Sequence, residues 1–290
     1  MTELPRRIVI VGGGYIGVEF AGILHGLGVE VCLIHRGTHL LRGFDADVQV
    51  TLLDEMRKRG VDVRIETLIE CVDKGSDGVL TLDLDDRTQL QTDALLWATG
   101  RAPNTRGLGL DASGVATRDD GTIIVSGPDF VTNVPHIHAV GDVIGTAALT
   151  PVALAQGMAF AKRTYGGADS LVSLANLPTA VFSQPNVGVV GMTEAMARRE
   201  HDIVIFRSRF RAMKHTMTGR QEKTMMKLIV DRKTDRVLGC HMVGPDAGEI
   251  VQGLAIALNA GATKAMFDAT IGIHPTAAEE FVTMRSVTRT

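Results

Sequence analysis

Excess charge of one sign, aromatic side chains and long apolar runs are all lacking in this sequence of 290 residues. The formal net charge of −3 provides no general attraction to nucleic acid or to an anionic membrane. Aromatic residues make up 4% of the chain, too few for a surface on which nucleic-acid bases stack. No apolar run has the length of a membrane-spanning helix. We therefore expect neither nucleic acid nor a membrane among the partners of this protein.

Cysteine is also scarce, with three residues at Cys32, Cys71 and Cys240. The number is odd and the three lie far apart in the sequence, so we expect no structural disulfide and a reducing, cytoplasmic location. Each cysteine is expected to be a small buried hydrophobic residue rather than a reactive thiol. No metal site is predicted. The sequence instead contains 45% hydrophobic and 22% charged residues, which is typical of a globular protein long enough for two domains.

The most informative stretch lies near the N-terminus. Ile8–Val11 is a short apolar run typical of a buried parallel strand, and Tyr15–Leu27 has the apolar spacing of a helix. Between them lies the pattern Gly12-x-Gly14-x-x-Gly17. In this context the first glycine turns the chain, the second lets the main chain approach a pyrophosphate, and the third lets the helix pack on the strand. The pattern predicts dinucleotide phosphates at the helix N-terminus, and a purely structural glycine turn is the alternative.

The residues after the second predicted strand, Val29–Ile34, indicate which dinucleotide binds. NAD-binding folds place an acidic residue here, where it binds the ribose 2′-hydroxyl. This sequence has His35 and Arg36 instead, Arg42 follows, and Glu30 lies at the other end of the strand. Guanidinium groups bind phosphate through paired hydrogen bonds, so the two arginines favour NADPH, which carries a 2′-phosphate. The alternative is a solvated basic loop.

Periodicity and capping residues predict the remaining elements of an α/β domain. They are a helix over Asp45–Arg59 with Asp45 as N-cap, a strand over Val61–Ile65, short antiparallel strands between residues 68 and 91, and a buried strand over Ala94–Ala98.

A second segment, rich in Gly, Asp, Ser and Thr, follows from residue 104. Its predicted features are short β signals at Val115 and Ile123–Val125, a strand over His136–Val140, and a helix with Thr150 as N-cap and Pro151 in its first turn. Asp142 is predicted either to bind a polar ligand near this helix or to be a simple turn acid.

From Asn176 onward the pattern changes to α+β. The predicted strands are Val181–Phe182, Val187–Val190, Ile203–Phe206, Lys227–Val230 and Val237–Met242. The apolar helix predicted over Glu249–Asn259 is either deep core or an oligomer interface.

Near the C-terminus, Pro275 suits the first turn of a helix, which would place His274 at its cap. Glu279 would then reach back to the imidazole and leave its other nitrogen to move a proton. A histidine in an ordinary loop is the alternative.

Taken together and in this order, the chain's motifs resemble the flavin-dependent pyridine nucleotide–disulfide oxidoreductases, and among them most closely the glutathione reductases. The motifs are GGGYIGVEFAGIL, HRGTHLLRGFD, ATGRAPN, HAVGD followed by LTPVALAQG, and HPTAAEEF. The resemblance covers nearly the whole chain. It implies a Rossmann-type NADP-binding domain over residues 1–98, the second segment of an FAD-binding domain over 99–172, and an α+β dimerisation domain over 173–290.

The same resemblance implies NADPH and FAD as cofactors and assigns the residues that bind them. Those implied for NADPH are Gly12, Gly14, Tyr15, Ile16, Gly17, Glu19, Arg36 and Arg42. Tyr15 would be the ring that covers the flavin until nicotinamide displaces it, and Glu19 the acid near the nicotinamide. The other cofactor-binding residues are Gly100, Arg101, Asp142 and Thr150, with Asp142 on the flavin ribityl chain and the helix at Thr150 directed at the flavin pyrimidine edge.

The resemblance also implies a homodimer that acts on glutathione disulfide. His274 and Glu279 match the acid–base dyad, which serves the active site of the other subunit. The positions expected near the substrate are Phe210, Arg211 and Met213.

One departure concerns the substrate. Met158 stands where many glutathione reductases have an arginine that helps to bind it, and Arg211 would replace that charge. The trypanothione and dihydrolipoamide types of the family remain alternatives.

A further departure concerns redox chemistry. Members of the family begin with an FAD domain that carries its own glycine pattern and a Cys-x-x-x-x-Cys pair, and this sequence contains neither. NADPH passes electrons to a disulfide only through the flavin and that pair, so we expect these 290 residues alone not to reduce glutathione disulfide. The chain is then expected to be a fragment of a glutathione reductase or a truncated relative. The alternative function is a dimeric module that binds NADPH without redox chemistry.

Overall fold

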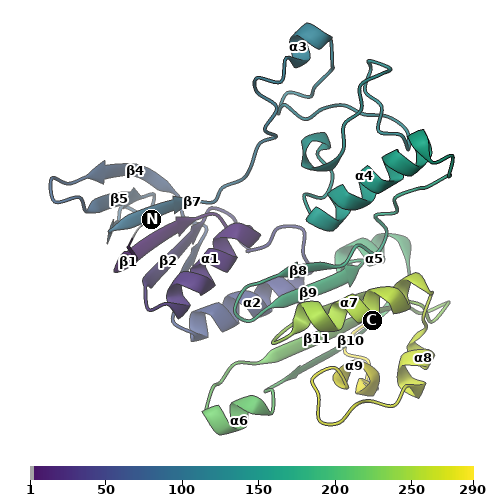
Figure 1. The fold of residues 1–290 in the computed structure, drawn as a ribbon. Coiled ribbons are helices and arrows are strands. Elements are labelled where there is room, and N and C mark those ends of the chain that lie inside the picture. The colour runs from purple at the N-terminus through teal and green to yellow at the C-terminus, as the bar shows by residue number, and fades with distance from the viewer. Residues whose placement is uncertain (1–2) are drawn as a thin grey trace. The chain divides into compact units, whose positions relative to one another are not determined.

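The computed structural model describes residues 3–290 (Figure 1). Contacts divide the chain into two compact units. The first comprises the described residues up to Thr99 together with Asn176–Thr290, and the second is Gly100–Ala175. The predicted three-domain boundaries stay a prediction. None of the helices within residues 3–290 is both long and apolar enough to cross a membrane.

A four-stranded parallel sheet forms the N-terminal part of the first unit, in the order β3-β2-β1-β7. Its strands are β1 Arg7–Val11, β2 Glu30–His35, β3 Asp62–Ile65 and β7 Ala94–Trp97, connected in part by helices α1 Tyr15–Gly26 and α2 Ala46–Lys58. The strands have buried apolar side chains because a parallel sheet is covered by its crossover helices. Asp45 caps α2 as predicted, since its side chain accepts from the Asp47 N–H at 3.0 Å.

One strand of this sheet is less buried than predicted. β7 lies at the sheet edge, its first three residues are half-buried and the Trp97 side chain is 57% exposed. An edge strand has a neighbour on one side only, so its apolar sequence does not guarantee burial. The predicted antiparallel strands are confirmed as a three-stranded sheet of β4 Ile69–Lys74, β5 Leu80–Leu84 and β6 Gln89–Thr92.

A five-stranded antiparallel sheet forms the C-terminal part of the first unit, in the order β10-β11-β12-β9-β8. Its strands are β8 Thr179–Val181, β9 Val187–Gly191, β10 Ile203–Phe210, β11 Thr224–Asp231 and β12 Val237–Val243. Helix α7, Ala247–Asn259, packs on β9 and β12 through Val251, Ala255 and Leu258, while Ile256 is exposed. The apolar helix therefore has one core face and one open face.

The C-terminal part also contains three short helices that the sequence pattern did not indicate, α5 Glu194–Glu200, α6 Lys214–Thr218 and α8 Lys264–Ala269, and a fourth, α9 Glu280–Thr283, near the helix predicted from Pro275. The predicted helix start at Pro275 is wrong, because α9 begins five residues later at Glu280. The Thr276 hydroxyl donates to the Ile273 carbonyl at 2.7 Å and accepts from the Glu279 N–H at 3.3 Å. These local bonds form a turn that competes with a helical start.

The second unit has little regular structure besides helix α4, Thr150–Tyr165, the short helix α3, Leu110–Ser113, and a 3₁₀ turn η1, Gly141–Ile144. The strand predicted at residues 136–140 is wrong, and the short β signals at residues 115 and 123–125 correspond to no more than an isolated bridge at Ile123. These segments make only isolated bridges within the described unit, such as Thr117 with Ile123 and Val131 with His138, and a strand needs a longer pairing partner. Thr150 is the first helical residue rather than the cap, which is Leu149.

Candidate functional site

The glycine turn, residues 12–14, joins β1 to α1 at the carboxyl end of the parallel sheet. Gly12 has φ +128°, and a Cβ there would lie 2.3 Å from the Ala98 carbonyl oxygen. A Cβ on Gly17 would lie 2.0 Å from the Gly12 carbonyl oxygen. Both positions therefore require glycine for the fold itself.

Gly14 differs from the other two glycines of the pattern. Its φ is −79°, it is exposed, and no atom lies within 4 Å of the place of a Cβ. The protein's own packing does not explain this glycine, whereas a phosphate group approaching the main chain would. Helix α1 begins at Tyr15, and no side chain among the described residues caps its first turn. The first N–H groups of α1 and its positive dipole end therefore face the open space beside Gly14.

Two side chains of α1, Tyr15 and Glu19, were predicted near the reacting rings of the cofactors and have different surroundings. Tyr15 is exposed, and its role as the ring that covers the flavin stays a prediction. The Glu19 carboxylate accepts a hydrogen bond at 2.9 Å from the main-chain N–H of Phe182, just after β8. Glu19 thereby links the parallel sheet to the antiparallel part of the unit.

The loop after β2, residues 36–44, carries the two predicted phosphate ligands, Arg36 and Arg42. Both are exposed, and within residues 3–290 neither forms a salt bridge. The loop is held against the glycine turn, because Gly13 accepts from the Leu41 N–H at 2.7 Å and donates to His35 Nδ1 at 3.1 Å. The structure therefore brings the predicted pyrophosphate and 2′-phosphate ligands together at one end of the sheet.

The predicted flavin ligands lie in the second unit. Asp142 is in the first turn of η1, about half exposed, with its carboxylate 3.9 Å from Arg101 Nη1. The preceding Gly141 has φ +78° and donates to Gln156 Oε1 of α4 at 2.7 Å. This buried bond fixes the turn relative to the helix that begins at Thr150. Gly100, at the start of the unit, has φ +145°, a conformation that favours glycine.

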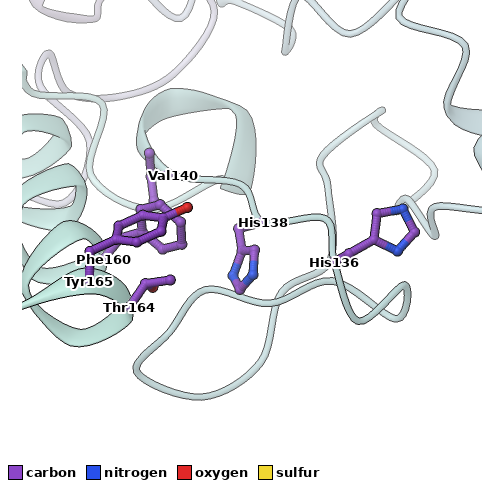
Figure 2. A pocket seen from close by; sticks show the side chains of 6 residues that line it. All are labelled: His136, His138, Val140, Phe160, Thr164 and Tyr165. Atoms are coloured by element: carbon purple, nitrogen blue, oxygen red, sulfur yellow. The ribbon is translucent and has the colours of Figure 1, made fainter. Parts of the chain in front are cut away.

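A cavity of about 330 Å³ in the second unit was not found from the sequence (Figure 2). It lies between the C-terminal half of α4 and the segment before Gly141, and its lining residues are His136, His138, Val140, Phe160, Thr164 and Tyr165. The His138 and Phe160 ring centroids are 4.8 Å apart, and His138 Nδ1–H donates to the Asp129 carbonyl at 2.8 Å. None of the predicted cofactor residues lines this cavity.

The predicted dyad is formed. His274 Nδ1 lies 3.1 Å from each carboxylate oxygen of Glu279, so its N–H donates to the carboxylate and Nε2 is left without this partner. The His274 side chain is 75% exposed, whereas that of Glu279 is 25% exposed. The contact arises from a turn rather than from the predicted helix. Its role in proton transfer stays a prediction.

The three predicted substrate positions lie at the end of β10 and on the arm that follows it, residues 211–223, which leads to β11. Phe210 is the last residue of β10 and is half-buried, while Arg211 and Met213 are exposed. The arm is fastened to the end of α2 through Glu222, which accepts from Arg59 Nη1 at 2.6 Å.

The parallel sheet and the glycine turn define an α/β fold of the dinucleotide-binding type, and a five-stranded antiparallel sheet belongs to the same unit. The pattern of the pyridine nucleotide-disulphide oxidoreductases matches residues 1–157, and that of their dimerisation domain matches residues 177–285. The chain belongs to this family.

Individual relatives refine the comparison. The chain is 48% identical over 283 residues to a glutathione reductase of Burkholderia cepacia, covering 97% of this chain and 63% of the relative. It is 46% identical over 290 residues to the chloroplastic/mitochondrial glutathione reductase of Pisum sativum, covering 100% of this chain and 52% of the relative. Among solved structures, the HOCl-induced flavoprotein disulfide reductase RclA of Escherichia coli matches with a TM-score of 0.87 at 29% identity, over 97% of this chain and 64% of that one. The chain thus spans between about half and two thirds of the length of these proteins.

Proposed function

We propose that this chain supplies the NADPH-binding and dimerisation parts of an NADPH- and FAD-dependent reductase that acts on glutathione disulfide. The observation that carries the proposal is the glycine turn, open at Gly14, beside a loop with two exposed arginines and no acid at the end of β2. Membership of the family and similarity to two glutathione reductases support it. The proposed domains are residues 1–98, 99–172 and 173–290, as predicted from the sequence.

In this proposal the coenzyme lies across the carboxyl end of the parallel sheet. The pyrophosphate rests on Gly14 and on the first N–H groups of α1, with Ile16 in that first turn, where the helix dipole favours an anion. Arg36 and Arg42 hold the 2′-phosphate, since guanidinium groups bind phosphate oxygens in pairs. Tyr15, the first residue of α1, is proposed as the ring that covers the flavin until nicotinamide displaces it, and Glu19, about one turn further along α1, is proposed to lie near the nicotinamide.

The second unit is proposed to hold part of the FAD. A bound flavin accepts hydride from nicotinamide and passes electrons to a disulfide. The Asp142 carboxylate suits a ligand hydroxyl, because it is exposed and its nearest cation, Arg101, is 3.9 Å away. Gly100 allows the chain to turn into this segment, and the first turn of α4 at Thr150 directs its dipole outward from the same unit.

The proposed partner is a second copy of the chain, and the proposed substrate is glutathione disulfide. His274, with its tautomer fixed by Glu279, keeps Nε2 for a proton that moves to or from a glutathione thiol. Arg211 supplies a positive charge near the anionic substrate, with Phe210 and Met213 beside it. The three free cysteines favour a reducing compartment such as the cytoplasm.

The cysteines also favour a second candidate function for these 290 residues taken alone, namely a dimeric module that binds NADPH without redox chemistry. Cys32, Cys71 and Cys240 lie on β2, β4 and β12, and none forms a disulfide. The prediction that each is buried is wrong for Cys71, which is exposed on the edge strand β4, and Cys32 is half-buried. Burial raises the pKa of Cys32 to about 12, which keeps this thiol protonated and unreactive. We propose that the purified chain does not oxidise NADPH when glutathione disulfide is added; sustained loss of NADPH absorbance would contradict this.

Calorimetric titration of the purified chain with NADP⁺ and with NAD⁺ tests the coenzyme assignment. The wild type is expected to prefer NADP⁺. Arg36→Ala and Arg42→Ala are each expected to weaken NADP⁺ binding by about tenfold or more, the value of a charge-assisted hydrogen bond, and to leave NAD⁺ binding within about twofold.

The matched control is Arg87→Ala, which removes an exposed arginine from the turn between β5 and β6. It is expected to bind both dinucleotides as the wild type does. Equal losses of NADP⁺ and NAD⁺ binding in the Arg36 and Arg42 variants would overturn the phosphate assignment. Equal affinities of the wild type for NADP⁺ and NAD⁺ would overturn it as well.

A further inference from the structure

The main chain of Gly13 is held from both sides, by the last residue of β2 and by the loop that follows it. Its N–H donates to His35 Nδ1 at 3.1 Å, and its carbonyl accepts from the Leu41 N–H at 2.7 Å. Gly13 is the middle residue of the glycine turn, which the dinucleotide pattern itself leaves unspecified. These two bonds connect the proposed pyrophosphate site to the loop that carries Arg36 and Arg42.

The His35 ring fills the space between two glycines. A Cβ on Gly13 would lie 2.6 Å from the ring Cγ, and a Cβ on Gly37 would lie 2.8 Å from Nε2. Neither position has room for a side chain while the ring stays in place. The imidazole therefore packs between the glycine turn and the start of the loop, where an NAD-binding fold has its ribose-binding acid.

Leu41 shows that the loop is held in a specific conformation. It is buried and has φ +52°, in the left-handed region that a bulky side chain rarely adopts. Such a conformation persists where surrounding bonds fix it. The bond to Gly13 is one of these, and the Leu41 carbonyl also accepts from Gln49 Nε2 at 2.9 Å and from the Phe44 N–H at 3.0 Å.

The bond from Gly13 requires a neutral imidazole with its hydrogen on Nε2, because Nδ1 acts as the acceptor. Burial lowers the pKa of His35, the charge of Arg36 lowers it further, and the main chain of His39 opposes this shift. The titratable and charged side chains of this loop are Arg36, His39 and Arg42, and the facing glycine turn carries none. Protonation of His35 would place two N–H groups against each other and break the bond.

We propose that His35 is a positioning residue for the coenzyme. Through Gly13 it fixes the glycine turn to the loop of Arg36 and Arg42, so that the pyrophosphate and 2′-phosphate sites form one preorganised unit. This inference rests on the proposed dinucleotide function. It predicts that loss of His35 weakens the binding of dinucleotides both with and without a 2′-phosphate. Loss of Arg36 or Arg42, in contrast, is expected to weaken only the binding of those that carry the 2′-phosphate.

Two substitutions separate the bond from the bulk of the ring. His35→Leu keeps a side chain of comparable bulk but removes the hydrogen-bond acceptor of the Gly13 N–H. In His35→Asn, the amide oxygen takes the place of Nδ1 as the acceptor. In calorimetric titrations at pH 7.5, His35→Leu is expected to weaken NADP⁺ and NAD⁺ by a similar factor of about ten. His35→Asn is expected to retain both affinities within about threefold.

Hydrogen exchange of the Gly13 amide gives a readout that does not depend on coenzyme. Protection is expected in the wild type and in His35→Asn and is expected to be lost in His35→Leu. Thermal unfolding shows whether each variant is folded. If His35→Leu does not fold, the affinities and the Gly13 protection of His35→Asn still test the proposal.

A pH series with NAD⁺, which carries no titrating 2′-phosphate, tests the protonation state. Because burial lowers the pKa of His35 from the ordinary histidine value, wild-type affinity is expected to hold at neutral pH and to fall only in more acidic solution, as His35 gains a proton, whereas the affinity of His35→Asn is expected to stay level. Loss of NADP⁺ binding alone in His35→Leu would assign His35 to the 2′-phosphate and overturn the proposal, as would unchanged binding of both dinucleotides. If the wild type binds neither dinucleotide, the proposed function itself fails.

Discussion

The ammonium group of Lys227 donates to Asp45 Oδ1 at 2.7 Å, and both side chains are almost completely buried. Lys227 lies on β11 and Asp45 caps α2, so the bond joins the antiparallel sheet to the parallel one. Lys227 Nζ also lies 2.7 Å from Asp47 and from Glu194. Arg289, near the C-terminus, bonds to the same two carboxylates. One buried cation thus has three acidic partners from two parts of the unit.

Removal of this cation is expected to destabilise the protein strongly. Lys227→Met keeps most of the side-chain volume but leaves Asp45 buried without its charge partner, at a cost of about 3–5 kcal/mol. Urea unfolding followed by circular dichroism measures the change. Lys233→Met removes an exposed lysine from the β11–β12 turn and is expected to stay within about 0.5 kcal/mol of the wild type. Similar midpoints for both variants would contradict the prediction.

The same cluster predicts how stability depends on pH. Burial alone would raise the pKa of Glu194, but hydrogen bonds from Arg289, Lys227 and Arg198 outweigh it and hold this pKa far below 4.5. The pKa of Asp47 is likewise held below 3.8, where bonds from Lys227 and Arg289 outweigh burial. The unfolded chain therefore takes up these protons first, so the stabilisation is complete above about pH 5 and is lost as the pH falls through 4.5 and below.

Thermal unfolding between pH 3 and pH 8 measures this dependence. Glu194→Gln is expected to reduce the loss of stability below pH 5, because it removes one of the two carboxylates. Glu200→Gln changes an exposed glutamate at the end of α5 and serves as the control. An identical acid profile for Glu194→Gln and the wild type would show that Glu194 is not responsible.

Two glycines of the turn are expected to respond differently to alanine. Gly17→Ala forces a methyl group against the Gly12 carbonyl oxygen and is expected to cost about 3 kcal/mol of stability. Gly14→Ala meets no neighbouring atom and is expected to unfold like the wild type, yet to bind NADP⁺ at least about tenfold more weakly, since its methyl group occupies the path of the pyrophosphate. Denaturation and calorimetry separate the two effects. Full NADP⁺ affinity in Gly14→Ala would move the phosphate elsewhere.

The dyad predicts a specific tautomer. Because Glu279 accepts from Nδ1–H of His274, neutral His274 is expected to carry its hydrogen on Nδ1. Nitrogen-15 chemical shifts of the imidazole distinguish this tautomer from the one protonated on Nε2. Glu279→Ala is expected to shift the ring towards the Nε2–H form, whereas Glu280→Ala, one residue away, is not. The same tautomer in all three proteins would show that Glu279 does not orient the ring.

Local sequence signals predicted an element correctly where the element depends mainly on residues close to one another in the sequence. The alternation of Leu82 and Leu84 predicted β5, and Asp45 marked the start of α2, because a strand face and a helix cap depend on residues close in sequence. His136–Val140 failed for the opposite reason. Its residues have the composition of a strand, but strand pairing depends on a neighbour that no local pattern reveals.

The sequence by itself determined the family, the glycine turn and the types of residue around it, because these depend on motifs with fixed spacing. Only the tertiary structure decided that His35 bonds to Gly13 across 22 positions, and that Lys227 meets Asp45 across 182. It also decided that a turn, and not a helix, brings His274 to Glu279. Such contacts form where separate elements pack, and packing depends on the whole unit rather than on any one stretch of chain.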